Sequence, residues 1–345
     1  MPFHLILPGL LWPQKALRDT AHDLPLPNLS WLLGRGRLEW QEPLPLENWL
    51  CRELGCGPGH QPPAAALRLL GEGGSPGNSI WLCADPMHVR IEQGRAHLFG
   101  GDLEITDEEM RQLAEALAPY FAEVGEFQAG ASGHGYLRLR QLPRLLTAPP
   151  SAAAGRGNLL PSGEDAARWL RLGNEAQMLL HALPLNARRE AAGRPTLNSL
   201  WFWGAGSLPE ATAGAAATVA TAYQPIIGDQ PVLKGLAAWA GVPHHPAASD
   251  PPTLPGSAKA TLLVLNELLQ ASQTLDAGLW RAALVDLESG WLKTLAAALR
   301  SGRLDRLRLT ALGDEATLDI TLTRADGMKF WRRPRLLHQL DFPRR

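Results

Sequence analysis

The sequence has few cysteines, and they form no known motif. Cys51, Cys56 and Cys83 are the only three in 345 residues, and no two of them make a Cys-x-x-Cys pair. An odd number of thiols in a chain of this length is typical of reduced cysteines in a cytosolic protein. We therefore expect a cytoplasmic protein without a disulfide framework or a cysteine-based redox or metal site.

Long hydrophobic runs and an imbalance of charge are missing as well. No stretch reaches the roughly 20 apolar residues of a membrane-spanning helix. The apolar segment 2–11 lacks the basic leader and the cleavage site of a signal peptide, and it predicts a buried first strand instead. With 33 Lys and Arg against 34 Asp and Glu, the chain as a whole gives no electrostatic reason to expect a nucleic acid or a membrane as partner.

One segment departs from this balance. Residues 329–335 are rich in arginine around Trp331, and Arg344 and Arg345 follow. Such a tail could contact a phosphate or an acidic partner. The alternative is a solvated terminus that keeps a hydrophobic end soluble.

The apolar content is sufficient for packed cores, because hydrophobic residues make up 45% of the chain. Strands are predicted from short apolar or alternating runs at 3–7, 79–83, 89–99, 135–142, 197–203, 304–312 and 317–323. Helices are predicted from apolar residues at helical spacing in 29–33, 106–121, from 162 onward, 231–239, 257–270 and 279–299. Thr106 and Glu109 form a capping box, and Gly302 ends the last helix. The unbroken apolar run at 197–203 predicts a buried parallel strand.

Two stretches rich in Pro and Gly, 55–63 and 147–160, predict hinges around a smaller unit. We expect a core domain formed by residues 1–63 and 159–345 and an inserted α/β domain formed by residues 64–158. Because strands and helices alternate, the sequence indicates an α/β fold with a doubly wound sheet.

A block of aromatic residues and glycines closes the run at 197–203. It reads Asn198-Ser-Leu-Trp201-Phe-Trp203-Gly204-Ala-Gly206 and follows a Pro-Leu-Asn segment at 184–186. Together with the segments 27–32 and 127–132, these motifs resemble, in order, the archaeal-type cofactor-independent phosphoglycerate mutases of the alkaline phosphatase superfamily. The resemblance implies an alkaline phosphatase-like doubly wound sheet with an inserted α/β domain. The segment 83–88 and the Trp-Phe-Trp-Gly block are most similar to bacterial RpfE-type regulatory proteins, which are phosphoglycerate mutase-like.

The resemblance also implies chemistry for which this sequence lacks the residues. Enzymes of that family hold two divalent cations through aspartates and histidines and phosphorylate a serine. Here Leu10 stands where a metal-binding aspartate follows the first strand, and the segment around Arg52 has no serine. His134 replaces part of a Tyr-Arg-His motif, so the phosphate-binding arginine that the resemblance implies is lost, and Asp314 lacks the histidine expected after it.

We therefore expect no metal, no cofactor and no catalytic residue, and a catalytically degenerate protein with a binding or regulatory role. Its ligand or partner would be a small phosphorylated molecule or a protein. The alternative is a metal-dependent phosphomutase or phosphatase that acts on a small phosphorylated metabolite, such as 3-phosphoglycerate, through a relocated site.

The candidate pocket residues come from two segments of the chain. Asp85 and His88 are expected in a loop that follows a strand and is made rigid by Pro86. As an acid/base or metal pair they would be short of one partner, and the alternative is that both bind local backbone. At the end of another strand, where ligands usually bind in α/β sheets, the candidates are Asn198, Trp201, Trp203, Gly204 and Gly206, with core packing as the alternative.

Two further features remain open. His244 and His245, with Asp250, could bind a metal weakly, although a proline-rich surface loop is the alternative. The sequence also has 12 tryptophans but only three tyrosines. Trp12, Trp31 and Trp331 could line an apolar groove or a partner surface.

Overall fold

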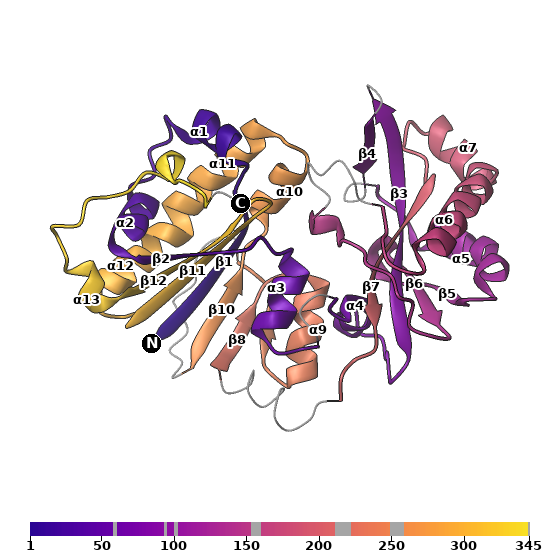
Figure 1. Ribbon diagram of the computed structural model, residues 1–345, viewed down its shortest axis with the longest axis horizontal. Helices are drawn as coiled ribbons and strands as arrows, with labels where there is room; N and C mark the ends of the chain where they lie inside the picture. Colours follow the sequence, from indigo (N-terminus) through magenta and orange to yellow (C-terminus); the bar gives the residue numbers. More distant parts are fainter. Residues whose placement is uncertain are drawn as a thin grey trace. The chain divides into compact units, whose positions relative to one another are not determined.

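The computed structural model describes residues 1–57, 61–92, 95–99, 103–152, 160–210, 222–248 and 259–343. The chain divides into two compact units, whose elements are labelled in Figure 1. Unit 1 contains residues 1–49, 213–230 and 240–345, and unit 2 contains residues 50–212 and 231–239. The expected inserted domain, 64–158, lies wholly within unit 2, which extends further on both sides.

A seven-stranded mixed sheet forms the centre of unit 1, in the order β2-β12-β11-β1-β10-β8-β9. Strand β1 pairs in parallel with β10 and β11, and an antiparallel ribbon of β12 and β2 completes one edge. The strands are β1 Pro2–Leu11, β2 Arg37–Gln41, β8 Tyr223–Ile227, β9 His244–His245, β10 Ala260–Val264, β11 Arg306–Gly313 and β12 Thr317–Thr323. The predicted buried first strand is thus confirmed as the central β1.

The main core of unit 1 lies on one face of this sheet. Phe3, Leu5 and Leu7 of β1 pack with buried leucines and tryptophans from the helices. The helices of the unit are α1 Gln14–Ala21, α2 Pro27–Arg35, α3 Leu46–Glu53, α10 Glu267–Gln273, α11 Ala277–Leu287, α12 Lys293–Ser301 and α13 Arg324–Gly327, where α3 continues into unit 2. Trp12 lies in this core against Trp280, with ring centroids 5.2 Å apart, and not in a surface groove.

The long C-terminal helix predicted at 279–299 is confirmed, with one irregularity. A π-helical turn at Glu288–Leu292 joins α11 to α12, and Gly302 ends the run in the left-handed conformation at φ +78°. The turn brings the buried Glu288 carboxylate to the amino end of α2. There it accepts hydrogen bonds from the backbone N–H groups of Asn28 at 2.6 Å and Leu29 at 3.0 Å.

The helix predicted at 257–270 is wrong at 260–264 and confirmed only from Glu267 onward. Residues 260–264 form strand β10 between β1 and β8, and a helix begins only at Glu267. A short run of buried apolar residues has no periodicity that distinguishes a strand from a helix. Here the position between two parallel strands decides the conformation.

Unit 2 contains an antiparallel sheet in the order β4-β3-β6-β5, with β7 paired to β3. Its strands are β3 Ile80–Glu92, β4 Arg95–Phe99, β5 Gly125–Ala129, β6 Gly135–Leu139 and β7 Ser199–Gly206. Its helices are α4 Ala64–Gly71, α5 Asp107–Phe121, α6 Ala166–His181, α7 Pro184–Ala191 and α9 Pro231–Ala240. The predicted Thr106–Glu109 capping box at the start of α5 is present.

Two expectations for unit 2 are corrected. Strand β7 is antiparallel to β3 and is not part of a parallel sheet. Its residues are apolar because the strand contacts both α4 and α6. The segment 84–88 is not a loop, because β3 continues through it. Pro86 fits in this strand because pairing with β6 ends at Cys83 and pairing with β4 begins at His88, so its missing N–H removes no bond there.

Candidate functional site

The seven predicted pocket residues lie together on the β3–β7 strand pair of unit 2. In its register Cys83 faces Trp203 and Asp85 faces Trp201. The aromatic block and the Asp-Pro-Met-His segment are therefore neighbours in space, although more than 100 residues separate them in the sequence. The structure thus brings the two candidate segments together, and their contacts determine what the group can do.

Asp85 is the centre of a buried polar cluster. Its carboxylate accepts hydrogen bonds from Arg68 Nη1 at 2.8 Å and Nη2 at 2.7 Å, and from Trp203 Nε1 at 2.7 Å. The backbone N–H of Gly135 adds a fourth at 3.2 Å. Four donors occupy the lone pairs of this carboxylate, so Asp85 has no capacity left to bind a metal or to accept a proton from a substrate.

The partner that sequence reasoning missed is Arg68, on α4. Its guanidinium also donates to Tyr136 Oη at 2.8 Å, and its central carbon lies 4.6 Å from the Tyr136 ring centroid and 5.2 Å from that of Trp203. Burial alone would raise the pKa of Asp85, but the charge and hydrogen bonds of Arg68 outweigh burial and lower it. The only signal for Arg68 was a single charge within the apolar helix 64–71.

The other predicted residues bind backbone or permit close packing. His88 Nδ1 lies 2.8 Å from the carbonyl oxygen of Thr196, and Asn198 bonds both the N–H and the C=O of Val89. The Trp201 indole donates to the carbonyl of Ala148 at 2.9 Å. These contacts match the backbone-binding and packing alternatives that the sequence left open.

The two glycines bring β7 close to the start of α4. Gly204 has φ +70°, and a Cβ there would lie 2.9 Å from the Cβ of Ala64. A Cβ on Gly206 would lie 2.9 Å from Pro63. Both glycines are thus required by packing.

Beside the Asp85 cluster, Glu72 and His134 form a pair in which one carboxylate oxygen can still accept a hydrogen bond. Glu72 Oε1 lies 2.5 Å from His134 Nδ1, while Oε2 of the same carboxylate is buried and has no hydrogen-bond partner among the described residues. The Glu72 side chain is 8% exposed and that of His134 is 29% exposed. His134 occupies a position where the family motif differs, so a carboxylate–imidazole pair stands where the resemblance implies a phosphate-binding arginine.

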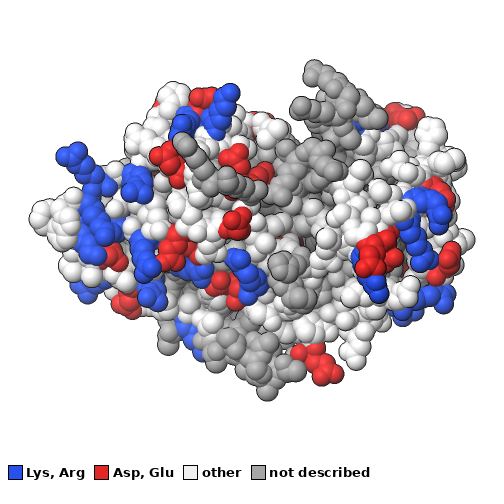
Figure 2. Space-filling view, in the orientation of Figure 1, with Lys and Arg blue, Asp and Glu red and all other residues white. Residues whose placement is uncertain are grey.

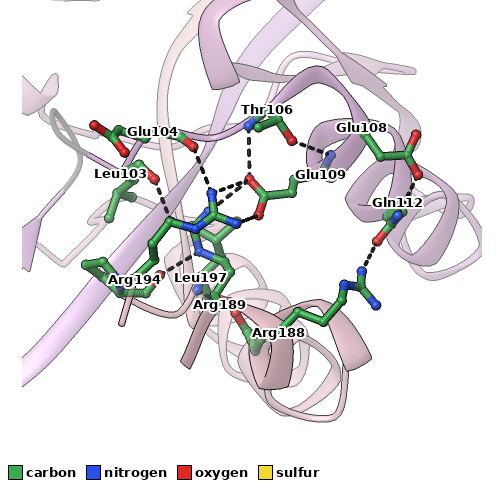
Figure 3. A network of polar contacts seen from close by, with 12 residues as sticks. Leu103, Glu104, Thr106, Glu108, Glu109, Gln112, Arg188, Arg189, Arg194 and Leu197 are labelled. Carbon is green, nitrogen blue, oxygen red and sulfur yellow. Dashed lines mark hydrogen bonds and ion pairs between the residues drawn. The ribbon is translucent and has the colours of Figure 1, made fainter. Parts of the chain in front are cut away.

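A second buried carboxylate, Glu109, fastens α5 to the chain before β7 (Figure 3). It accepts from Arg189 Nη1 at 2.9 Å, from Arg194 Nη2 at 2.7 Å and from the N–H of Thr106 at 3.0 Å. Burial would raise the pKa of Glu109, but the Thr106 hydrogen bond and the two arginines lower it. Arg189 is fully buried and also donates to the Leu103 carbonyl. The network therefore stabilises the packing of α5 against this segment and is not accessible to a ligand through Arg189.

Unit 1 contains a buried chain of hydrogen-bonded side chains across its sheet. His4 is 2% exposed, with Nδ1 2.8 Å from Tyr223 Oη and Nε2 2.9 Å from Thr310 Oγ1. The Thr310 hydroxyl donates to Asp319, so it accepts from Nε2–H, and Nδ1 in turn accepts from Tyr223. Burial, and next the charge of Arg308, lower the pKa of His4 well below its usual value. The neutral imidazole fits this order of donors and acceptors.

The carboxyl end of β1, where the family would place its first metal ligand, is filled with apolar side chains. Leu10, Leu11 and Trp12 are 1%, 2% and 5% exposed, and the indole of Trp280 donates to the carbonyl of Gly9. Within the described ranges, no group of three or more His, Cys, Asp or Glu side chains could hold a metal ion.

Two amide side chains nevertheless follow adjacent parallel strands at the same edge. Gln230 follows β8 and Asn266 follows β10, and these strands pair in parallel. Both amide oxygens are buried and lack a hydrogen-bond partner in the described part of the chain. His244 of β9 lies next to β8 and contacts the Gly228 carbonyl at 2.7 Å; Asp250, predicted to join it, lies outside the described residues.

No family model matches the chain. The probable 2,3-bisphosphoglycerate-independent phosphoglycerate mutase of Geobacter sulfurreducens is 34% identical over 111 residues, or 30% of this chain and 27% of that protein. The chain therefore matches little more than a quarter of this curated relative. Among solved structures, the alignment with the PH0037 protein from Pyrococcus horikoshii covers 93% of this chain and 87% of the PH0037 chain. The TM-score is 0.52 and the sequence identity is 16%.

The cofactor-independent phosphoglycerate mutase from Thermoplasma acidophilum aligns with 100% of this chain and 96% of its own, with a TM-score of 0.48 and 18% identity. At 16% identity the comparison with PH0037 shows the fold alone: the chain has a mixed α/β fold similar to that of the PH0037 protein.

Proposed function

We propose that this chain is a phosphoglycerate mutase-like protein that has lost metal-dependent phosphotransfer and acts in the cytoplasm as a binding or regulatory protein. The observation that carries the proposal is the burial of Leu10 where a metal-binding aspartate would stand. A carboxylate there would have to enter an apolar core, and an isolated ligand cannot hold a two-metal cluster. A regulatory role agrees with the motifs that resemble RpfE-type proteins.

The binding half of the proposal rests on Gln230 and Asn266. In open α/β sheets ligands bind beyond the carboxyl ends of the strands, which is where both amides lie. Because their unpartnered atoms are oxygens, which accept hydrogen bonds, they suit a small ligand that carries hydroxyl groups. A hydroxylated phosphoester of three carbons has this chemistry.

The loss of catalysis is tested on the purified full-length protein. After incubation with Mn²⁺ and dialysis, mass spectrometry should find no stoichiometric metal, and assays with 3-phosphoglycerate should show no mutase or phosphatase turnover. A metal-dependent mutase assayed in parallel controls for the conditions. Two bound ions per chain, or turnover, would overturn the proposal in favour of a relocated phosphotransfer site.

The binding site is tested separately by calorimetric titration with 3-phosphoglycerate. We expect heat of binding that is lost in an Asn266→Ala, Gln230→Ala double variant and kept in Gln270→Ala, a matched amide on the exposed face of α10. No heat of binding in the native protein, or equal binding by all three proteins, would contradict a site at these amides.

A further inference from the structure

An exposed apolar tip follows α13 in unit 1. Four large apolar side chains within nine residues stand in solvent, with Met328 67%, Phe330 82%, Trp331 67% and Leu336 40% exposed. The Phe330 and Trp331 rings pack edge to face at 5.3 Å. Apolar side chains that gather at the surface mark sites of interaction.

The backbone of this tip is fixed to α2. Arg35 Nη2 donates to the Phe330 carbonyl at 3.2 Å, and Arg332 Nη1 returns a bond to the Arg35 carbonyl at 3.0 Å. The N–H of Arg335 donates to the Ser30 carbonyl at 3.0 Å. At Gly34 the approach is so close that a Cβ would overlap the backbone of Arg333. The aromatic side chains are therefore presented by an ordered segment, which reduces the entropy cost of docking.

Basic residues from separate segments lie at the end of the unit 1 sheet from which α13 and the tip continue. The sheet register brings Arg37 of β2 opposite Thr321 and Arg306 of β11 opposite Thr323, at the end of β12 from which α13 continues. The exposed cations at this end are Arg37, Arg300, Arg303, Arg306, Arg324, Arg332, Arg333 and Arg335. Figure 2 shows Lys and Arg gathered on this side of unit 1, at the left of the view.

Few acidic residues neutralise this face. Glu39 pairs with Arg37, Asp326 with Lys329, and Asp305 with the chain's amino terminus. In the described part of the chain no acidic side chain pairs with Arg333 or Arg335. Since the whole chain has a formal charge of only -1, the excess of positive charge here is offset by acidic residues elsewhere. Unit 1 thus carries a local excess of positive charge next to the apolar tip.

We propose that this basic, apolar tip docks peripherally on a membrane surface that contains anionic phospholipid. Phe330 and Trp331 would enter the boundary between headgroups and acyl chains, where such rings are favoured, while the arginines contact lipid phosphates. Met328 and Leu336 distinguish this partner from a single-stranded nucleic acid, because bases stack on aromatic or guanidinium planes and not on aliphatic chains.

A protein partner fits the tip less well. Specific protein interfaces bury about 800 Å² on each side around a central pocket, whereas the apolar side chains here project from a single loop of nine residues. A lipid surface has no such minimum area, because apolar insertion and attraction to anionic headgroups add up residue by residue. No helix of the described chain is long and apolar enough to cross a bilayer, so the association would be reversible and superficial.

The test is co-sedimentation of the full-length protein with vesicles of phosphatidylcholine alone and of phosphatidylcholine mixed with phosphatidylglycerol. We expect binding to the anionic vesicles only, weakened by salt. An Arg332→Gln, Arg333→Gln, Arg335→Gln variant should bind on the order of a hundredfold more weakly, since each cation at the surface contributes roughly a fivefold factor. A Phe330→Ala, Trp331→Ala variant should lose the binding that persists at high salt.

Two matched controls keep the comparison specific. Met178→Ala removes a similarly exposed apolar side chain of α6, and Arg140→Gln with Arg144→Gln and Arg171→Gln removes three exposed cations of unit 2. Both should bind as the native protein does. The proposal is overturned if the native protein ignores anionic vesicles or if the tip variants bind like the controls. It is also overturned if single-stranded RNA or polyglutamate, but not the vesicles, binds through the tip residues.

Discussion

The indole N–H of Trp203 donates to the carboxylate of Asp85 at 2.7 Å across the β3–β7 strand pair. This bond joins the two motifs that the sequence singled out, and Arg68 completes the cluster from α4. The most distinctive residues of the sequence therefore hold a buried ion pair between a helix and a sheet. Their role in stability can be measured separately from any role in binding.

Replacing Trp203 by Phe should reduce the free energy of unfolding by about 1.5–3 kcal/mol, because a buried carboxylate loses a charge-assisted hydrogen bond. Trp201→Phe is the control, since that indole donates only to a neutral carbonyl, and it should cost about 0.5–1.5 kcal/mol. Urea unfolding followed by circular dichroism measures both. Equal losses of unfolding free energy in the two variants would show that the hydrogen bond to Asp85 contributes no more than a bond to a neutral carbonyl.

Replacing Arg68 by Met should be more harmful, at about 3–5 kcal/mol, because the Asp85 charge stays buried without its partner. A double variant, Arg68→Met with Asp85→Leu, should regain much of this loss, since no uncompensated charge remains. Urea midpoints compare the single and double variants. If the double variant is as unstable as the single one, packing and not charge explains the effect.

The stability of the protein should fall as the pH drops from about 7.5 to about 5.5, in part because of His4. Its folded-state pKa is lowered by burial, so below about pH 6.5 the unfolded chain takes up a proton that the folded chain excludes. The contribution of His4 is complete above its unfolded pKa and is lost as the pH falls toward the folded value. Urea unfolding at both pH values should show a smaller loss of unfolding free energy for His4→Gln than for the native protein. An identical change of unfolding free energy with pH in the two proteins would refute the assignment to His4.

Glu288→Ala should destabilise the protein by about 1–2 kcal/mol, because the first N–H groups of α2 lose their acceptor. Asp286→Asn is the matched control, since Asp286 is exposed one half-turn earlier, and it should change little. Thermal unfolding distinguishes the two. Hydrogen exchange at Asn28 and Leu29 should rise only in Glu288→Ala, and unchanged protection there would argue against the cap.

Local signals in the sequence predicted much of the fold. The capping box at Thr106 and Glu109 and the glycine stop at Gly302 depend on neighbours in the chain, and both are present. The direction of β7 and the strand at 260–264 depend on which distant segments lie beside them. A short apolar run carries no information on that point, so both expectations failed.

The site shows the same limit. The sequence identified Asp85 and Trp203 by their motifs, but their contact is set by strand register, and Arg68 enters from a helix whose composition is mostly Ala and Leu. Glu72 and His134 likewise meet across 62 residues. Long-range pairing of buried charges leaves no periodic trace in a single sequence, so Arg68 and Glu72 could not be assigned roles before the structure.

The division of the chain sets an order of folding during synthesis. Unit 2 has its whole sequence once Trp239 has left the ribosome, including the helix α9 whose Gly235 packs against Leu67 of α4. At that moment the sheet of unit 1 still lacks β9, β10, β11 and β12, and β10 and β11 are the two neighbours of β1. Domains fold as units as they emerge, so unit 2 is completed first. Strand β1 stays without a sheet neighbour until β10 at Ala260–Val264 is made, and its second neighbour, β11, follows only at Arg306–Gly313.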